Sequence, residues 1–260
     1  MGLKLAISGK GGVGKTTIAA LLSHLAASEG RRVLAVDADP AAHLAATMGM
    51  PEKDRRRIVP LSERRALIEE RTGAKVRQYG QLFKLNPEVS DIAEQESARF
   101  RTISLLVLGA IERGGSGCAC PESVILKALV ADLVLHRVDC VSLDMEAGLE
   151  HLGRATAGGV DLLLIVADPS RRAVETAAQV RRMAGEIGIR RVAAAGNKVA
   201  SPADEAFLRD AFRDVAYLGH IPDDEAVRRA DREGLPLIDI APPPLLGCFR
   251  DLWRQVASGA

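Results

Sequence analysis

The sequence predicts an α/β fold in which helices flank a doubly wound, mostly parallel β-sheet. Three observations predict it: short apolar runs alternate with helical segments, a phosphate-binding pattern joins the first run to the first helix, and carboxylates follow two later runs. Runs that are apolar at every position are typical of strands buried on both faces, as parallel sheets require. We expect one domain over residues 1–260, because no internal repeat or low-complexity linker divides the chain.

The expected strands and helices alternate along the chain, as βα units require. Strands are expected at residues 3–7, 33–36, 82–85, 103–108, 141–143, 162–167 and 192–195. Helices are expected at residues 17–27, 124–135, 171–187 and 245–256. We expect the last helix to close the core with Phe249 and Trp253 buried. Residues 51–80 are dense in Arg and Glu, which predicts a solvated helical insertion with irregular edges.

Composition argues against several classes of protein. The 35 basic and 34 acidic residues leave a net charge of +1, and only 3% of residues are aromatic, so no nucleic-acid partner is expected. No apolar run approaches the roughly 18 residues that span a membrane. The last helix has only Arg250 and Arg254 as basic residues, too few for a stable interfacial anchor. Lys4, Lys10 and Lys15 interrupt any signal peptide, so we expect a cytoplasmic protein with reduced cysteines.

Residues 9–16 match the phosphate-binding pattern G-x-x-x-x-G-K-[ST] between a predicted strand and a predicted helix. The glycines let the backbone fold tightly around an anion, and the helix adds its positive N-terminal end. Lys15 is expected to reach the β- and γ-phosphates, and the Thr16 hydroxyl to bind Mg²⁺. The residues expected to contact nucleotide here are Gly11, Gly12, Val13, Gly14, Lys15, Thr16 and Thr17. The pattern therefore predicts a nucleoside triphosphate site.

Carboxylates stand at the ends of two predicted strands. Asp37 and Asp39 follow residues 33–36, and Asp144 follows residues 141–143. In a doubly wound sheet the carboxyl ends of the strands face the ligand, so these groups point toward the phosphates. Asp144 is expected to hold Mg²⁺ through water, and Gly148 permits a bend that responds to the γ-phosphate. For Asp37 two interpretations stay open, a role in the site and a cap on the next segment.

Asn197 and Lys198 follow another apolar run and resemble the N-K-x-[DE] element that recognises a base. Guanine recognition needs a carboxylate at the fourth position of that element, where this chain has Ala200. We therefore expect ATP to be preferred, with Asn197 reading the edge of adenine and Lys198 beside the nucleotide. Ile221 and Pro222 are expected to form an apolar wall for the base.

Cys118 and Cys120 stand two residues apart, ahead of a helix whose first turn contains Pro121. The helix N-terminus is expected to lower the pKa of the thiols and favour thiolate. Two thiolates do not complete a four-ligand site, whereas a twofold dimer would join two pairs into one S₄ site. Soft thiolates suit Ni²⁺, Zn²⁺ or an iron–sulfur cluster, and spacing does not choose among them. Cys140 and Cys248 stand alone in apolar surroundings and are expected in the core.

The string K-G-G-V-G-K-T-T, from Lys10 to Thr17, resembles the deviant Walker A loop of the MinD/ParA-type ATPase superfamily. This resemblance implies a P-loop NTPase fold like that of MinD and the nitrogenase iron protein. It implies that Lys10 crosses a dimer interface to contact the partner's nucleotide. It also implies that Asp39, in the D-A-D-P switch, positions the attacking water and contacts Mg²⁺ through water.

The order of phosphate loop, D-A-D-P switch, C-x-C and the D-M-x-A-G-x-E-H segment at residues 144–151 is similar to that of the CooC-type nickel-insertion ATPases. These are accessory proteins of carbon monoxide dehydrogenase, and the similarity covers essentially the whole chain, including residues 114–116. The resemblance implies an ATP-hydrolysing homodimer that binds Ni²⁺ with both cysteine pairs. It further implies release of Ni²⁺ during hydrolysis, apo carbon monoxide dehydrogenase as client, and Zn²⁺ as a surrogate metal.

Two other interpretations stay open. One is an iron–sulfur-bridged, ATP-dependent electron-transfer protein like the nitrogenase iron protein, although the cysteines of that protein lie on separate segments and these are adjacent. The other is a ParA/MinD-type positioning ATPase that works on DNA or a membrane.

Overall fold

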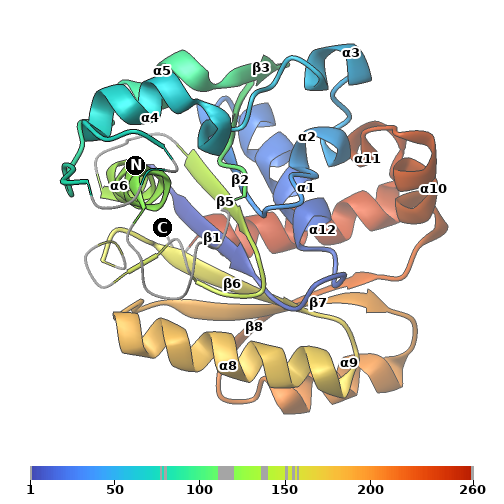
Figure 1. The fold of residues 1–260 in the computed structure, drawn as a ribbon. Helices are drawn as coiled ribbons and strands as arrows, with labels where there is room; N and C mark the ends of the chain where they lie inside the picture. The colour runs from blue at the N-terminus through green and yellow to red at the C-terminus, as the bar shows by residue number, and fades with distance from the viewer. Residues whose placement is uncertain are drawn as a thin grey trace.

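The computed structural model describes residues 2–76, 78, 81–110, 120–135, 140–149, 152–153, 156 and 158–258. An eight-stranded sheet runs through it in the order β3-β4-β2-β5-β1-β6-β7-β8. The β3–β4 pair is antiparallel, and the other neighbouring pairs are parallel. Helices cover both faces of the sheet (Figure 1), which confirms the predicted α/β class.

The strands buried on both faces lie where the uniformly apolar runs predicted them. All residues of β1, β2, β5 and β6 are buried. The strands are β1 (Lys4–Ser8), β2 (Val33–Ala38), β3 (Ala98–Phe100), β4 (Ile103–Val107), β5 (Cys140–Met145), β6 (Leu162–Ala167), β7 (Val192–Val199) and β8 (Ala216–Pro222).

Prediction was less accurate away from the sheet centre. The strand expected at residues 82–85 is wrong: Leu82 is 98% exposed and Leu85 66% exposed, so these side chains have no buried face on which a strand could pack. The edge strands β3 and β8 were not predicted. β3 has three residues, and the pairing of β8 with β7 is irregular, with Gly219 in the middle of the strand.

The helices follow the strands in the expected alternation, and α8 has the predicted bounds. They are α1 (Lys15–Ser28), α2 (Leu44–Thr47), α3 (Glu52–Arg55), the 3₁₀ turn η1 (Leu61–Glu63), α4 (Arg65–Thr72), α5 (Ile92–Glu96), α6 (Pro121–Leu135), α8 (Arg171–Ile187), α9 (Pro202–Ala211), α10 (Glu225–Glu233), α11 (Leu237–Ile240) and α12 (Pro243–Ala257).

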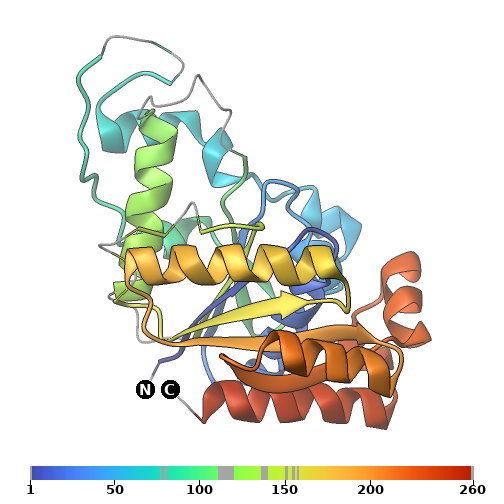
Figure 2. The ribbon, with the colours of Figure 1, turned by 90° about the horizontal axis from the view of Figure 1, so that it is seen from below.

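Helix α12 closes one face of the sheet. It lies across the molecule from α8 and α9, which cover the other face (Figure 2). Phe249 and Trp253 are 1% and 3% exposed, and the indole N–H of Trp253 donates to Glu29 at 2.7 Å. The prediction that this helix completes the core is confirmed. No helix within the described residues is both long enough and apolar enough to cross a membrane.

The charged segment forms short helices, as predicted, but it also has a buried side. Leu61 and Ile68 are 1% and 0% exposed. The backbone N–H of Ser62 donates to the carbonyl oxygen of Leu108 at 2.9 Å, which places η1 beside the end of β4. Residues 77, 79 and 80 of this segment lie outside the described residues.

Candidate nucleotide and metal site

The loops that carry the predicted site follow three adjacent strands. Asp144 of β5 stands opposite Ile7 of β1 on one side and opposite Asp37 of β2 on the other. Because these strands are parallel, the phosphate loop and both carboxylates lie at one edge of the sheet, as predicted.

Two glycines of the phosphate loop stand where larger residues do not fit. Gly9 has φ of 149°, and a Cβ there would overlap the carbonyl oxygen of Val166 in β6. Gly14 has φ of 92°, and a Cβ there would overlap the amide nitrogen of Asn197 in β7. Strands β6 and β7 therefore determine the path of the loop, and only glycine allows it.

The rest of the loop offers backbone groups to an anion. Gly11 and Gly12 are exposed, whereas Val13 is 0% exposed and anchors the loop in the core. Gly14 is the N-cap of α1, and no side chain caps the helix there. The backbone N–H groups at the positive N-terminal end of α1 therefore remain available to a phosphate.

The loop lysines and threonines surround this helix end. Lys15 is 6% exposed, and its ammonium donates to the carbonyl oxygen of Lys10 at 3.4 Å. A single long hydrogen bond leaves its other two hydrogens for phosphate oxygens. Thr16 and Thr17 are half-buried in the first turn of α1. Lys10 is also half-buried, and its contact with a partner subunit stays a prediction.

The Asp144 carboxylate is buried without a hydrogen-bond partner. The residue is 1% exposed, and neither carboxylate oxygen is bonded within the described residues. Burial raises the pKa of Asp144 to about 7. The Thr16 hydroxyl and the Lys15 ammonium lower this pKa less than burial raises it, and Thr16 makes no hydrogen bond of ordinary geometry to the carboxylate. Such an oxygen pair beside a threonine hydroxyl fits the hard ligand set that Mg²⁺ requires.

Asp37 has a structural role. Its carboxylate accepts from the backbone N–H of Leu44 at 2.8 Å and of Asp39 at 3.3 Å. These bonds confirm the interpretation of Asp37 as a cap on the following segment. Burial raises its pKa to about 6. Asp39 is half-buried and accepts from the backbone N–H of Ala41 at 2.9 Å, so one of its oxygens helps to shape the switch loop.

The base-recognition pair contacts the phosphate loop. The Asn197 amide donates to the carbonyl oxygen of Val13, and the Lys198 ammonium donates to that of Gly12, both at 2.7 Å. Lys198 has φ of 58°, a strained value for a residue with a side chain. The pair therefore braces the loop, a role that the N-K-x-[DE] resemblance does not indicate.

The predicted apolar wall lies at the end of β8. Ile221 is 1% exposed and belongs to the core, whereas Pro222 is half-buried and pairs with Val199 of β7. Contact of Asn197, Ile221 and Pro222 with adenine stays a prediction.

Ser8, the last residue of β1, is a further residue of the site that no sequence pattern indicated. Its hydroxyl donates to the carbonyl oxygens of Glu146 at 3.0 Å and Gly148 at 3.2 Å. The only sequence signal was its place directly before the phosphate loop. Strand patterns do not reveal which loop a terminal side chain contacts.

Of the cysteine pair, Cys120 is described, and Cys118 lies outside the described residues together with residues 114–116 and 150–151. Cys120 is half-buried directly before α6, and its sulfur accepts from the backbone N–H of Ser123 at 3.4 Å. For Cys120 the expected lowering of the thiol pKa is wrong: burial raises the pKa of Cys120, and the Glu122 carboxylate raises it further, which outweighs the lowering by the Ser123 N–H.

The remaining predictions on metal ligands concern side-chain clusters and the two isolated cysteines. Over the ranges that the structure describes, no three His, Cys, Asp or Glu side chains gather as a metal site. Cys140 is 5% exposed, as predicted for a core residue, whereas Cys248 is only half-buried and packs against the core from outside.

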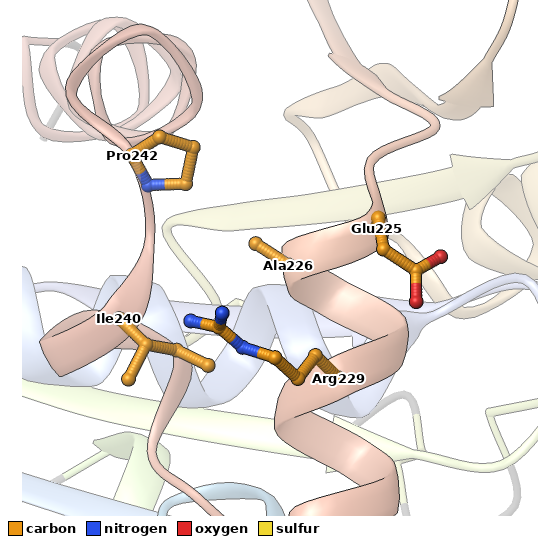
Figure 3. A pocket seen from close by; sticks show the side chains of 5 residues that line it. All are labelled: Glu225, Ala226, Arg229, Ile240 and Pro242. Atoms are coloured by element: carbon orange, nitrogen blue, oxygen red, sulfur yellow. The ribbon is translucent and has the colours of Figure 1, made fainter.

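A hollow beside α10 is separate from these groups. It lies between that helix and the residues that lead into α12 (Figure 3). Its lining residues, none of which belongs to the nucleotide site, are Glu225, Ala226, Arg229, Ile240 and Pro242. The Glu225 carboxylate already pairs with Arg228 at 2.7 Å.

Comparison with known proteins gives a consistent family. A family model described as the CobQ/CobB/MinD/ParA nucleotide binding domain matches residues 4–237. The carbon monoxide dehydrogenase accessory protein CooC of Rhodospirillum rubrum is 43% identical, over 92% of this chain and 91% of that protein. An uncharacterized ATP-binding protein of Methanocaldococcus jannaschii is 44% identical, over 90% of this chain and 91% of its own length.

Solved structures of MinD share the fold. MinD of Pyrococcus horikoshii, complexed with Mg-ADP, has a TM-score of 0.69 at 24% identity and covers 98% of this chain and 96% of its own. The cell division ATPase MinD of Pyrococcus furiosus has a TM-score of 0.68 at 25% identity, and the match covers 100% of both chains.

Proposed function

The chain belongs to the CobQ/CobB/MinD/ParA family of nucleotide-binding proteins and is an ATPase, and from this premise we propose that it is a metallochaperone. In this proposal the protein dimerises with ATP and metal and binds Ni²⁺ as cargo between two Cys-x-Cys motifs. It then inserts the Ni²⁺ into carbon monoxide dehydrogenase. The observation that carries the ATPase part is the buried, unpartnered Asp144 carboxylate at the edge of the phosphate loop.

The proposed hydrolysis assigns each group one task. Lys15 neutralises charge on the β- and γ-phosphates, and the N–H groups of the loop and of α1 bind their oxygens. Thr16 and Asp144 would hold a magnesium ion, which supplies charge neutralisation between these phosphates. Asp39 orients the attacking water. Lys10 of one protomer contacts the nucleotide of its partner, so that two chains complete one site.

The proposed metal site lies on a chain that leaves the same sheet edge. Strand β4 ends at Val107, and the next backbone N–H, that of Leu108, donates to the carbonyl oxygen of Asp37 at 2.9 Å. Cys120 stands where this connection enters α6. Eleven residues, 109–119, separate this hydrogen bond from Cys120 along the chain. Coupling between nucleotide state and metal binding through this connection is part of the proposal.

The client is inferred from a relative. The CooC protein that is 43% identical to this chain is named as an accessory protein of carbon monoxide dehydrogenase. The match runs over nearly the whole of both chains, so it includes the segments on each side of the cysteine pair. We therefore propose the apo form of carbon monoxide dehydrogenase as the recipient of the nickel.

The two other candidate functions differ in what they require of the chain. An iron–sulfur electron donor requires a chromophore after anaerobic purification. A positioning ATPase requires a surface for DNA or lipid. The apolar residues of α12 do not supply a lipid surface, because Leu245, Phe249 and Leu252 are each at most 2% exposed.

The test is anaerobic binding of Ni²⁺ with and without ATP, read together with molecular mass by light scattering. We expect one Ni²⁺ per dimer and no visible iron–sulfur absorption. The double variant Cys118→Ser/Cys120→Ser should lose stoichiometric Ni²⁺ binding while it retains ATP binding. Cys248→Ser is the matched control, since it removes another half-buried thiol. One Ni²⁺ per monomer, or full binding by the double variant, would refute the shared site.

A further inference from the structure

Ser8 joins the end of β1 to the loop that follows Asp144. Its side chain is 0% exposed. The hydroxyl donates to the carbonyl oxygens of Glu146 at 3.0 Å and Gly148 at 3.2 Å. A serine hydroxyl has one hydrogen, so the two carbonyls share it. One side chain thereby holds both ends of a three-residue bend.

These bonds lie where the pairing of the two strands has ended. The register between β1 and β5 runs as far as Ile7 and Asp144. Beyond it the side chains of Glu146 and Ala147 are exposed and provide no packing. Within the bend, the N–H of Gly148 donates to the carbonyl oxygen of Glu146 at 2.7 Å. The residues on each side of the bend, Met145 and Leu149, are buried in the core, and within the bend the Ser8 hydroxyl makes the connection to the neighbouring strand.

Ser8 itself sits on a rigid support. On its other side it stands opposite Ile165 in the register of β1 with β6. The next residue, Gly9, packs so closely on Val166 that a Cβ would overlap the carbonyl oxygen there. Ser8 is therefore held between this close contact on β6 and the loop after Asp144. Its hydroxyl is placed to couple the position of the phosphate loop to that of the loop after Asp144.

We propose that Ser8 is a positioning residue of the ATPase reaction. Its hydroxyl keeps the loop that follows Asp144 aligned with the phosphate loop, so that the Asp144 carboxylate stays directed at the phosphate end of the site. Ser8 touches neither nucleotide nor attacking water in this role. The proposal rests on the ATPase activity of the family and does not involve nickel. A negative result in the nickel-binding experiment would therefore not affect the test of Ser8.

The chain offers a matched control. Ser142 lies in β5 and is 3% exposed, and its hydroxyl has no hydrogen-bond partner within the described ranges. Ser142→Ala removes a buried hydroxyl from the same sheet without cutting a bond to the loop. A hydroxyl that serves only to fill the core would make Ser8→Ala and Ser142→Ala behave alike.

The experiment compares these two variants in the full chain. It measures steady-state ATP hydrolysis, ADP affinity, and hydrogen exchange of residues 144–149 with ADP and with a non-hydrolysable ATP analogue. Ser8→Ala should lower kcat about tenfold, the effect of roughly one hydrogen bond on alignment, and leave the Kd for ADP within about twofold. It should also reduce the difference in exchange between the two nucleotides. Ser142→Ala should match the wild type in all three.

Ser8→Thr keeps the hydroxyl and should recover kcat. Wild-type kcat and exchange in Ser8→Ala would overturn the proposal, as would a Ser8→Thr protein as slow as Ser8→Ala. Loss of ADP binding in Ser8→Ala would assign the hydroxyl to the folding of the phosphate loop and would also overturn it.

Discussion

Asp37 and Asp144 stand opposite each other on neighbouring strands, and their hydrogen bonds give them different roles. The Asp37 carboxylate accepts from two backbone N–H groups, which hold the switch loop in place. The Asp144 carboxylate has no hydrogen-bond partner among the described residues. An unpartnered buried carboxylate costs stability in the empty protein, a pattern typical of a group that is kept for a ligand.

This cost makes the stability of the nucleotide-free protein depend on pH. The Asp144 pKa is about 7 in the folded chain, against 3.8 as the ordinary value. Between these values the folded protein holds a proton that the unfolded chain has lost, so this group lowers stability as pH rises, and its full cost is present above pH 7.

Asp144→Asn should therefore raise the free energy of unfolding at pH 8 by up to roughly 4 kcal/mol, from about 1.4 kcal/mol per pKa unit, and change it little near pH 4. Urea unfolding at both pH values measures this. The Asp37 pKa is also raised, and the charge of the facing Asp37 adds to the rise in the Asp144 pKa, so the stabilisation by Asp144→Asn includes relief of this repulsion. Asp39→Asn is the control, since Asp39 is half-buried. Equal stabilisation at the two pH values would contradict the assignment.

Lys15→Ala and Asp39→Ala should fail for different reasons. Loss of Lys15 removes positive charge from the β- and γ-phosphates, so both nucleotide affinity and turnover should fall, each by at least about tenfold. Loss of Asp39 should spare binding and stop water attack, which leaves an ATP-bound dimer. ATP affinity, phosphate release and molecular mass separate the two cases. An Asp39→Ala protein that hydrolyses ATP at the wild-type rate would show that Asp39 does not position the water.

At the scale of elements, the central strands could be predicted because both of their faces are buried. The run at residues 162–167 is apolar throughout and became β6 with the same bounds. The edge strand β8 escaped prediction because its residues are mostly half-buried and its pairing with β7 is irregular. Residues 82–85 were wrongly predicted as a strand because apolar side chains also occur in exposed loops. An apolar run predicts a strand reliably only where the strand is buried on both faces, in the middle of the sheet.

The phosphate loop was predictable in the same sense, because its chemistry is contained in consecutive residues. The contacts that brace it were not. Asn197 and Ser8 reach the site from separate strands, and their partners are backbone carbonyls, which carry no sequence signal. The site residues proposed from the sequence either form the consecutive pattern of the phosphate loop or stand at or near the ends of apolar runs, apart from the cysteine pair, and both features are visible in the sequence itself.

The bracing role of Asn197 predicts a loss that does not depend on the base. Asn197→Ala should weaken binding of ATP and of tripolyphosphate by the same factor, about fivefold for one lost hydrogen bond, because the amide holds the Val13 carbonyl of the phosphate loop. Isothermal titration with both ligands measures this. Pro222→Ala is the control and should affect ATP alone. A loss confined to ATP in Asn197→Ala would make Asn197 a reader of the base instead.

Nucleotide choice should depend on the residue after Val199. Ala200 offers no acceptor for guanine, so ATP should bind more tightly than GTP, with a difference on the order of 1–3 kcal/mol. Ala200 is exposed, so Ala200→Asp introduces a carboxylate without repacking the core and should shift preference toward GTP. Competition binding with the two nucleotides measures both effects. Equal affinities in the wild type would refute the base-recognition assignment.

At the scale of the whole molecule, the parallel sheet places the chemistry at one edge. The phosphate loop, the switch after β2 and the loop after β5 all follow carboxyl ends of adjacent strands, and the chain that reaches Cys120 leaves β4 at the same edge. A dimer that joins two such edges would bring nucleotide and cysteines into one interface. Because the net charge is only +1, two copies of the chain repel each other little at long range.

Such a dimer makes metal and nucleotide thermodynamically linked. If Ni²⁺ and ATP both select the same dimer, each must raise the affinity of the other by an equal factor. Titration of Ni²⁺ at several ATP concentrations should give this factor. Titration of ATP at several Ni²⁺ concentrations should give the same value. Lys10→Ala should remove the contribution of ATP to dimerisation and leave that of Ni²⁺, because in the proposal the lysine bridges to the partner's nucleotide and not to the metal. In the proposed mechanism, hydrolysis would then weaken the dimer and open the metal site, so that ATP drives release of the metal. Independent binding of the two ligands, with a factor of one in both directions, would contradict this mechanism.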